Sequence, residues 1–156
     1  MRRLDPTHGA VRVEDRFDTD IDDLWQACTT PERLARWIGE VSGDLRVGGT
    51  FQASWTSSWT GSGRVDRCEA PHHLLVTLDP GDDEQTEVEA WLTEEGVQSR
   101  LVVEERGLPL LKLHFYGSGW QAHLEDLARS LAGQESVWHQ RWTELTPVYE
   151  ELGVDQ

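Results

Sequence analysis

The chain has 156 residues, enough for one domain with its own core, and a formal net charge of −15 from 29 acidic and 14 basic side chains. An acidic surface repels phosphate groups, so we expect neither nucleic acid nor a membrane as a partner. There is no apolar run of transmembrane length and no apolar stretch behind the N-terminal arginines, so we expect a cytoplasmic protein with both cysteines reduced.

The first predicted strand covers residues 10–19, where apolar and charged side chains alternate. Val11, Val13 and Phe17 share one face of this strand with a single acid, Asp15. Because alternate residues of a strand point to the same side, we expect Asp15 to lie on the apolar face.

Two short helices are predicted next. Asp20 stands where the N-cap of a helix over residues 21–29 would be. Pro31 is typical of the first position of a second helix, and Trp37 falls on its apolar face.

The middle of the chain predicts an antiparallel meander, because short strand-like runs are separated by turn residues. Phe51 and Trp55 alternate with polar residues and therefore share one face. The leucine-rich segment 107–115, which contains Leu108, is expected to be a loop that folds over the interior. The predicted strands cover residues 44–47, 50–55, 63–69, 73–78, 84–93 and 98–106.

A long amphipathic helix is predicted over residues 118–132. Ser118 and Gln121 have the spacing of a capping box, and Gly133 is placed to end the helix. Asp126 falls on the predicted polar face. The opposite, apolar face carries Trp120, His123, Leu124, Leu127, Ala128 and Leu131.

The remaining residues divide into an N-terminal segment, 1–9, and an amphipathic helical extension, 134–156. The domain proper would cover residues 10–133. We expect the extension to pack on the domain or on a second copy, and a homodimer is one such arrangement.

The order of these elements resembles the helix-grip fold of the START-like (SRPBCC) superfamily. It is most similar to the branch named after the heat-shock-protein-90 ATPase activator homologue (AHSA). The resemblance is carried by Leu24-Trp25, by residues 29–34 with Trp37, by residues 47–51, 63–65, Pro71 and Leu74, and by Gly119-Trp120 with the leucines behind them.

The resemblance implies an α+β fold in which a curved antiparallel sheet of six to seven strands wraps around the long C-terminal helix. Two short helices would follow the first strand, and a helical tail would follow the long helix. Such tails also occur in bacterial members of the family.

In this fold the sheet and the last helix enclose an elongated apolar space. The expected ligand is a small hydrophobic or amphipathic molecule, although these side chains could instead meet and fill the interior. The candidate ligand-binding residues come from three parts of the fold. Strand parity would place Asp15, Phe17, Phe51, Trp55, Val103 and Glu105 on the inner face of the sheet. Trp37, Trp120 and His123 would approach from the helices, and Leu108 and Tyr116 would close the mouth.

Three functions remain open at this point. The chain could bind a ligand, or it could be a protein-interaction or chaperone-regulating module without one. It could also be a cyclase- or hydrolase-like enzyme in which Asp15, Glu105 or His123 acts as acid or base. The competing interpretation is that Glu105 reaches solvent and that Asp15 is satisfied by a nearby group.

No metal or cofactor is expected. The chain has no Cys-x-x-Cys or His-x-x-x-His spacing that would bind a metal. The run 117–122 fits G-x-G-x-x-A, but no βαβ unit follows it to receive a dinucleotide.

Overall fold

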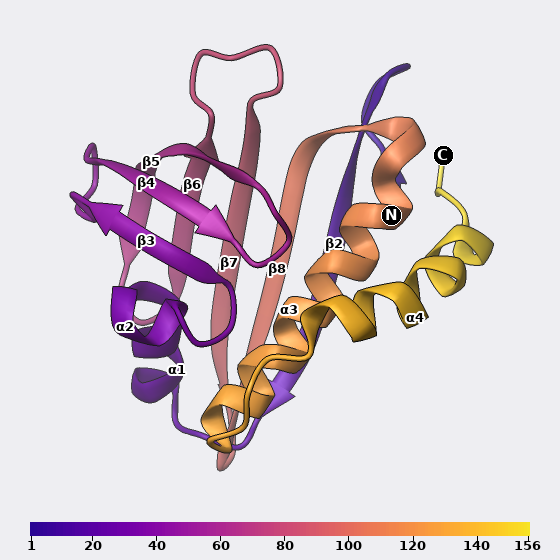
Figure 1. Ribbon diagram of the computed structural model, residues 1–156. Helices are drawn as coiled ribbons and strands as arrows, with labels where there is room; N and C mark the ends of the chain where they lie inside the picture. Colours follow the sequence, from indigo (N-terminus) through magenta and orange to yellow (C-terminus); the bar gives the residue numbers. More distant parts are fainter.

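The computed structural model describes residues 1–156 and contains one antiparallel sheet of eight strands in the order β1-β2-β8-β7-β6-β5-β4-β3 (Figure 1). The strands are β1 (Arg2–Arg3), β2 (His8–Phe17), β3 (Gly39–Gly43), β4 (Thr50–Trp55), β5 (Thr60–Glu69), β6 (His73–Leu78), β7 (Thr86–Glu95) and β8 (Gln98–Pro109).

The long helix α3 lies against the sheet and contacts β2, and the last helix runs alongside α3 on the side away from β3 and β4 (Figure 1). This arrangement confirms the predicted helix-grip fold. The helices are α1 (Ile21–Thr29), α2 (Pro31–Leu34), the 3₁₀ helix η1 (Leu110–Lys112), α3 (Leu113–Leu131) and α4 (Trp138–Leu152). None of them is long and apolar enough to cross a membrane.

The start of each short helix is as predicted. The carboxylate of Asp20 accepts a hydrogen bond from the backbone N–H of Asp23 and so caps α1. Pro31 occupies the first turn of α2, where a backbone N–H would have no acceptor within the helix, so the lack of one in proline costs no hydrogen bond.

The predicted strand over residues 44–47 is wrong. The Asp44 carboxylate accepts hydrogen bonds from the backbone N–H and the guanidinium of Arg46, which makes this segment a turn. The strand before the turn is β3, which pairs with β4.

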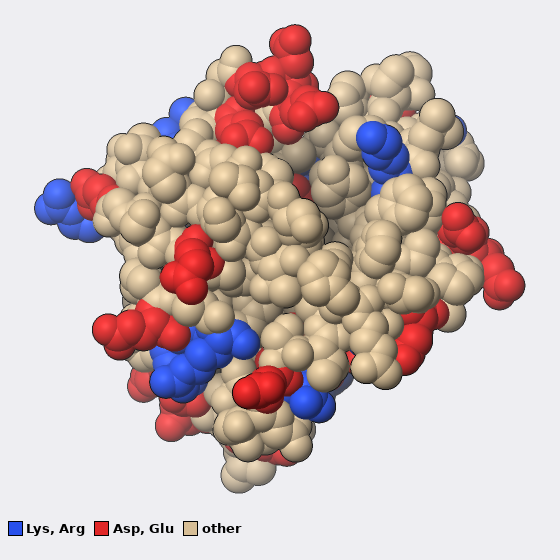
Figure 2. Space-filling view, viewed as in Figure 1, with Lys and Arg blue, Asp and Glu red and all other residues tan.

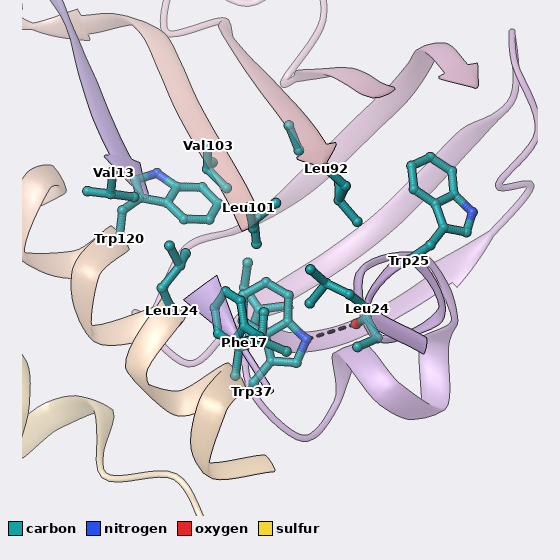
Figure 3. Packing of buried hydrophobic residues seen from close by; sticks show 14 of the residues in the cluster. Val13, Phe17, Leu24, Trp25, Trp37, Leu92, Leu101, Val103, Trp120 and Leu124 are labelled. Atoms are coloured by element: carbon teal, nitrogen blue, oxygen red, sulfur yellow. Dashed lines mark hydrogen bonds between the residues drawn. The ribbon is translucent and has the colours of Figure 1, made fainter. Parts of the chain in front are cut away.

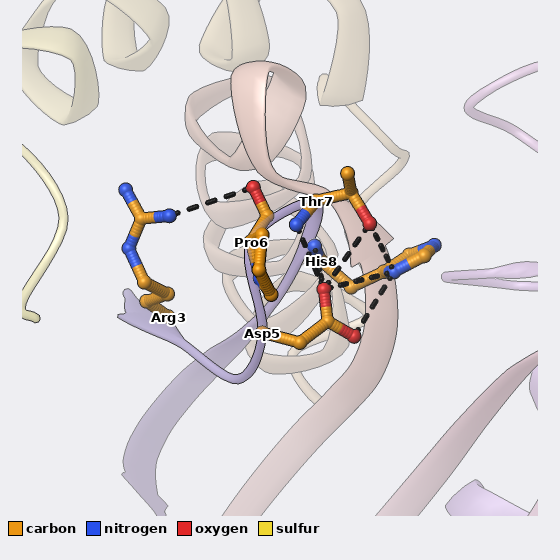
Figure 4. Close-up of polar contacts among 5 residues, drawn as sticks. All are labelled: Arg3, Asp5, Pro6, Thr7 and His8. Atoms are coloured by element: carbon orange, nitrogen blue, oxygen red, sulfur yellow. Dashed lines mark hydrogen bonds and ion pairs between the residues drawn. The ribbon is translucent and has the colours of Figure 1, made fainter.

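The sheet has one strand more than the upper number expected, because Arg2 and Arg3 pair with β2 in the segment taken to precede the domain. Arg3 also donates its backbone N–H to the carbonyl of Asp155, so the two ends of the chain lie side by side. The turn between β1 and β2 is held by Asp5, whose carboxylate accepts backbone N–H bonds from Thr7 and His8 (Figure 4). These bonds lower the pKa of Asp5 to about 2.

The predicted start of the long helix is also wrong. The helix begins at Leu113, and Ser118 is a buried interior residue whose hydroxyl donates to the carbonyl of His114 at 2.8 Å. The leucine-rich segment is therefore not a loop. Leu108 lies at the end of β8 and Leu113 opens α3, and burial of both side chains explains why the segment is so apolar.

The main core lies where α1 and α3 meet the sheet, and Figure 3 shows Phe17, Leu24 and Leu101 packed there. The indole N–H of Trp37 donates to the carbonyl of Ala27 at 2.9 Å, which ties the segment after α2 to α1. This bond holds the Trp37 ring in the main core, between the helices and the sheet.

The face of α3 that was predicted to be polar is covered by α4. Asp126 is almost completely buried there, and its carboxylate accepts hydrogen bonds from the backbone N–H of Val137, at 3.0 Å, and from the Ser136 hydroxyl. Gly117 lets α4 approach closely, because a Cβ atom there would clash with the Tyr149 ring. The G-x-G-x-x-A run thus belongs to a helix–helix contact.

Candidate ligand-binding cavity

An apolar cavity of about 130 Å³, here called the inner chamber, lies between the sheet and the helices. Its volume is comparable to the ~150 Å³ cavity that is known to admit benzene. Of the 19 lining residues, 18 are hydrophobic, and they include Cys28, Leu34, Trp37, Phe51, Val65, Leu74, Val76, Val88, Ala90, Leu101 and Val103.

The ring of Phe51 helps to shape the inner chamber. It lies directly over Gly63 of the neighbouring strand, so close that a Cβ atom at residue 63 would be 2.1 Å from Cζ of the ring. Only a residue without a side chain leaves room for the ring in this position.

A second and larger cavity of about 490 Å³, here called the outer chamber, lies at the mouth of the fold. It is bounded by the loop between β6 and β7, the end of β8, the start of α3 and the rings of α4. Trp55, Leu78 and Trp120 line both chambers. The two chambers therefore meet at these three side chains.

Glu105 is the buried acid of the outer chamber. Its two carboxylate oxygens accept hydrogen bonds from the Trp120 indole and the Thr86 hydroxyl, both at 2.8 Å. Burial raises the pKa of Glu105, and the two bonds oppose this effect only in part. The side chain lies inside the protein, so the expectation that it reaches solvent is wrong.

A second carboxylate in the outer chamber is held in the same way. The indole N–H of Trp59 donates to Asp79 at 3.1 Å, and the Trp59 ring lies 5.2 Å from that of Trp55. Neither Asp79 nor Trp59 was predicted as a site residue. The segment containing Asp79 was recognisable only as a turn, and nothing in the order of residues indicates its contact with Trp59.

His123 closes the chamber on the α3 side. Its ring is buried between the rings of Trp120 and Trp138, with centroid distances of 5.5 and 5.3 Å. Burial lowers the pKa of His123 to about 4, so the ring is neutral at neutral pH.

Most of the predicted site residues line one of the chambers. Trp37, Phe51 and Val103 line the inner chamber. The outer chamber is lined by Glu105, Leu108, Tyr116 and His123, and Trp55 and Trp120 line both.

Two predicted residues lie elsewhere. Phe17 is buried in the core and lines neither chamber. Asp15 is exposed and lies opposite Leu101, whereas Glu105 lies opposite Val11. At about 3.4 Å per residue, the two acids are about 14 Å apart along the sheet. They therefore do not form the expected acid–base pair.

No group of three or more His, Cys, Asp or Glu side chains is arranged to hold a metal ion. Both cysteines are free thiols, and both line the inner chamber. The chemistry that these chambers offer is thus apolar contact, aromatic stacking and hydrogen bonding to two carboxylates.

A sheet that grips a helix around an apolar cavity defines the class of START-like ligand-binding-type domains. Within that class, the chain belongs to the family described as Activator of Hsp90 ATPase homolog 1-like protein, whose profile matches residues 18–132. No functionally curated protein matches the chain.

Several solved structures are similar to the chain. The crystal structure of CalU16 from Micromonospora echinospora shares 28% identity over 95% of this chain and 98% of its own, with a TM-score of 0.75. DynU16, a protein of the dynemicin biosynthetic locus, shares 27% identity over 81% of this chain and 49% of its own, with a TM-score of 0.74. EF2215 from Enterococcus faecalis, a conserved protein of unknown function, shares the fold at 19% identity over 97% of this chain and 88% of its own, with a TM-score of 0.77.

Proposed function

We propose that this chain is a cytoplasmic domain that binds a small, largely hydrophobic ligand between the sheet and α3. The observation that carries the proposal is the inner chamber, where 18 of 19 lining residues are hydrophobic. A hydrophobic ligand in this chamber would gain about 25 cal/mol for each Å² of apolar surface removed from water.

The two chambers together also suit the size of a ligand. The inner chamber alone has room for about one aromatic ring. The outer chamber, at about 490 Å³, falls within the range of roughly 300–1,000 Å³ that is typical of ligand pockets. An amphipathic molecule would place its apolar body inside and its polar end outside.

Two further observations support the choice of compartment and ligand. Free thiols at Cys28 and Cys68 are typical of a reducing environment. DynU16 is described from a biosynthetic locus, so molecules made by such loci form the first set of ligands to be tested.

A neutral fluorescent probe, N-phenyl-1-naphthylamine, tests whether the inner chamber binds apolar molecules. Ala90 is buried and lines this chamber, so Ala90→Leu would fill part of it. Ala128 is exposed on α3, and Ala128→Leu is the matched control. We expect Ala90→Leu to weaken probe binding at least about tenfold, because the ring and the added side chain compete for one volume.

Equal probe binding by the wild type and both variants would place the probe outside the inner chamber and contradict the proposal. Native mass spectrometry of protein purified from its source provides the independent measurement. We expect a co-purifying small molecule that is lost in Ala90→Leu and retained in Ala128→Leu.

A further inference from the structure

Two carboxyl groups in the outer chamber, those of Glu105 and Asp79, accept hydrogen bonds but have no cationic side chain as a partner. Glu105 is bonded by Trp120 and Thr86, and Asp79 is bonded by Trp59 and more weakly by a backbone N–H. All these donors are neutral, and neither carboxylate takes part in an ion pair. Glu105 is buried and Asp79 is half-buried, so the ionised form of Glu105 is unfavourable without a counter-charge. A cation in the chamber would supply that counter-charge.

The other charges of the chamber have mostly the same sign. Asp83 and Glu84 line it from the loop between β6 and β7, and Lys112 is the single lysine or arginine in its wall. In Figure 2, acidic side chains gather over this loop at the top of the view, and one basic group lies across the hollow, over the start of α3. Acidic residues in the wall outnumber the single lysine, and His123 is neutral, so the chamber favours a cation over an anion.

Aromatic rings form much of the remaining wall. The rings of Trp55 and Trp59 lie 5.2 Å apart on one side, and those of Phe115 and Trp142 lie 5.8 Å apart on the other. The face of an aromatic ring attracts a cation, and the attraction strengthens when the cation is shielded from water. Aromatic faces combined with unpaired carboxylates are the arrangement that recognises ammonium groups.

We propose that the ligand has a cationic head, a protonated amine or a quaternary ammonium, that lies in the outer chamber against Glu105 and Asp79. This inference rests on the proposed function, because it assigns the polar end of the ligand whose apolar body fills the inner chamber. A neutral polyol would stack on the rings but leave both carboxylates without a counter-charge. An anionic head would be repelled.

Three probes share a naphthalene ring and differ in the charge of the polar group: 1-naphthylmethylammonium, 1-naphthylmethanol and 1-naphthoate. They test whether the chamber prefers a cationic, a neutral or an anionic group. Their affinities for the full chain are measured by isothermal titration calorimetry at about pH 8. We expect the ammonium to bind at least about tenfold more tightly than the alcohol. The carboxylate is expected to bind most weakly.

Two variants locate the effect. Glu105→Gln keeps the shape of the side chain, and the Thr86 hydroxyl can reverse its bond to suit an amide. Asp79→Asn is a second test, because asparagine tolerates the left-handed backbone of residue 79, where φ is 49°. Each is expected to reduce the preference for the ammonium over the alcohol to about twofold or less. Glu94→Gln, at an exposed site outside both chambers, is the control for loss of one charge.

The outcomes separate this inference from the proposed function. Equal affinities for the three probes, or tightest binding of the alcohol, would overturn the cationic head and leave a ligand-binding cavity in place. Retention of the ammonium preference in both Glu105→Gln and Asp79→Asn would also overturn it. Failure of every probe to bind the folded wild type would overturn both proposals.

Discussion

Gly117 on α3 lies so close to the ring of Tyr149 on α4 that a Cβ atom at residue 117 would be 2.6 Å from Cδ1 of the ring. Tyr149 is fixed from its other end, because its hydroxyl donates to the side chain of Gln121 at 2.7 Å. The absence of a side chain at residue 117 therefore determines how closely the two helices pack.

Gly117→Ala is expected to destabilise the protein, because the new methyl group pushes the Tyr149 ring and α4 outward. Overpacking of this kind costs about 1–3 kcal/mol, of which alanine recovers about 1 kcal/mol through its higher helix propensity. Gly119→Ala is the matched control, since its Cβ would meet nothing closer than 3.4 Å. Urea unfolding should show a lower midpoint for Gly117→Ala and an unchanged or higher one for Gly119→Ala.

Asp126 anchors the start of α4, and its loss should loosen this helix. In Asp126→Ala the backbone N–H of Val137 and the hydroxyl of Ser136 lose their charged acceptor. We expect a loss of about 2–3 kcal/mol in the free energy of unfolding. Asp22→Ala, at an exposed position in α1, should change it far less. Faster hydrogen exchange confined to residues 138–152 would show that α4 is the element released, whereas an unchanged rate there would contradict this account.

His123 should make the protein less stable in mild acid. Burial lowers its pKa from 6.5 to about 4, so between these values the unfolded chain binds a proton that the folded chain does not. The stability that the neutral ring contributes is therefore complete above pH 6.5 and is lost as the pH falls, by up to about 3 kcal/mol near pH 4. Other acids titrate in the same window, so the measurement is the difference between the wild type and His123→Gln. His139→Gln, at an exposed site, is the control and should follow the wild type.

Glu105 should have the opposite pH dependence. Burial raises its pKa, so the folded chain holds its proton to a higher pH than the unfolded chain does. Its stabilising contribution is present below the unfolded pKa and is lost as the pH rises through the folded pKa. Tyr116 faces the same chamber, and its pKa is raised by burial and by the charge of Glu105. Glu105→Gln should therefore unfold at a higher urea concentration than the wild type at about pH 8. The difference in urea midpoint between Glu105→Gln and the wild type should disappear in acid. If this difference were the same at every pH, titration of Glu105 could not be its cause.

Most individual strands and helices could be predicted from periodicity, because strand alternation and helical spacing report which side of an element is buried. Their helix-grip arrangement was expected from the family that the order of elements resembles. Phe51, Trp55 and Trp120 were assigned to the cavity in this way, and they line it. The method failed where a second element changed the environment. Asp126 belongs to a polar stripe of α3, yet α4 covers that stripe and uses the carboxylate as an anchor.

The positions of the acidic side chains in the site were harder to predict, again because they depend on neighbouring elements. Asp15 has the parity of Val13 and Phe17, but it is exposed. Asp79 lies in a turn, and its contact with Trp59 joins two turns far apart in the chain. Parity gives the direction of a side chain from its own strand, but it cannot give the neighbours that the sheet brings from elsewhere.

The Phe51 ring lies directly against Gly63. The depth of the inner chamber therefore depends on residue 63 having only a hydrogen atom as its side chain. A methyl group at residue 63 would tilt the ring away from β5 and into the space now left free. Related chains with alanine or valine at residue 63 would then accept only thinner ligands, although every residue in contact with the ligand stayed the same. Selection for ligand size can thus act on a residue that the ligand never touches.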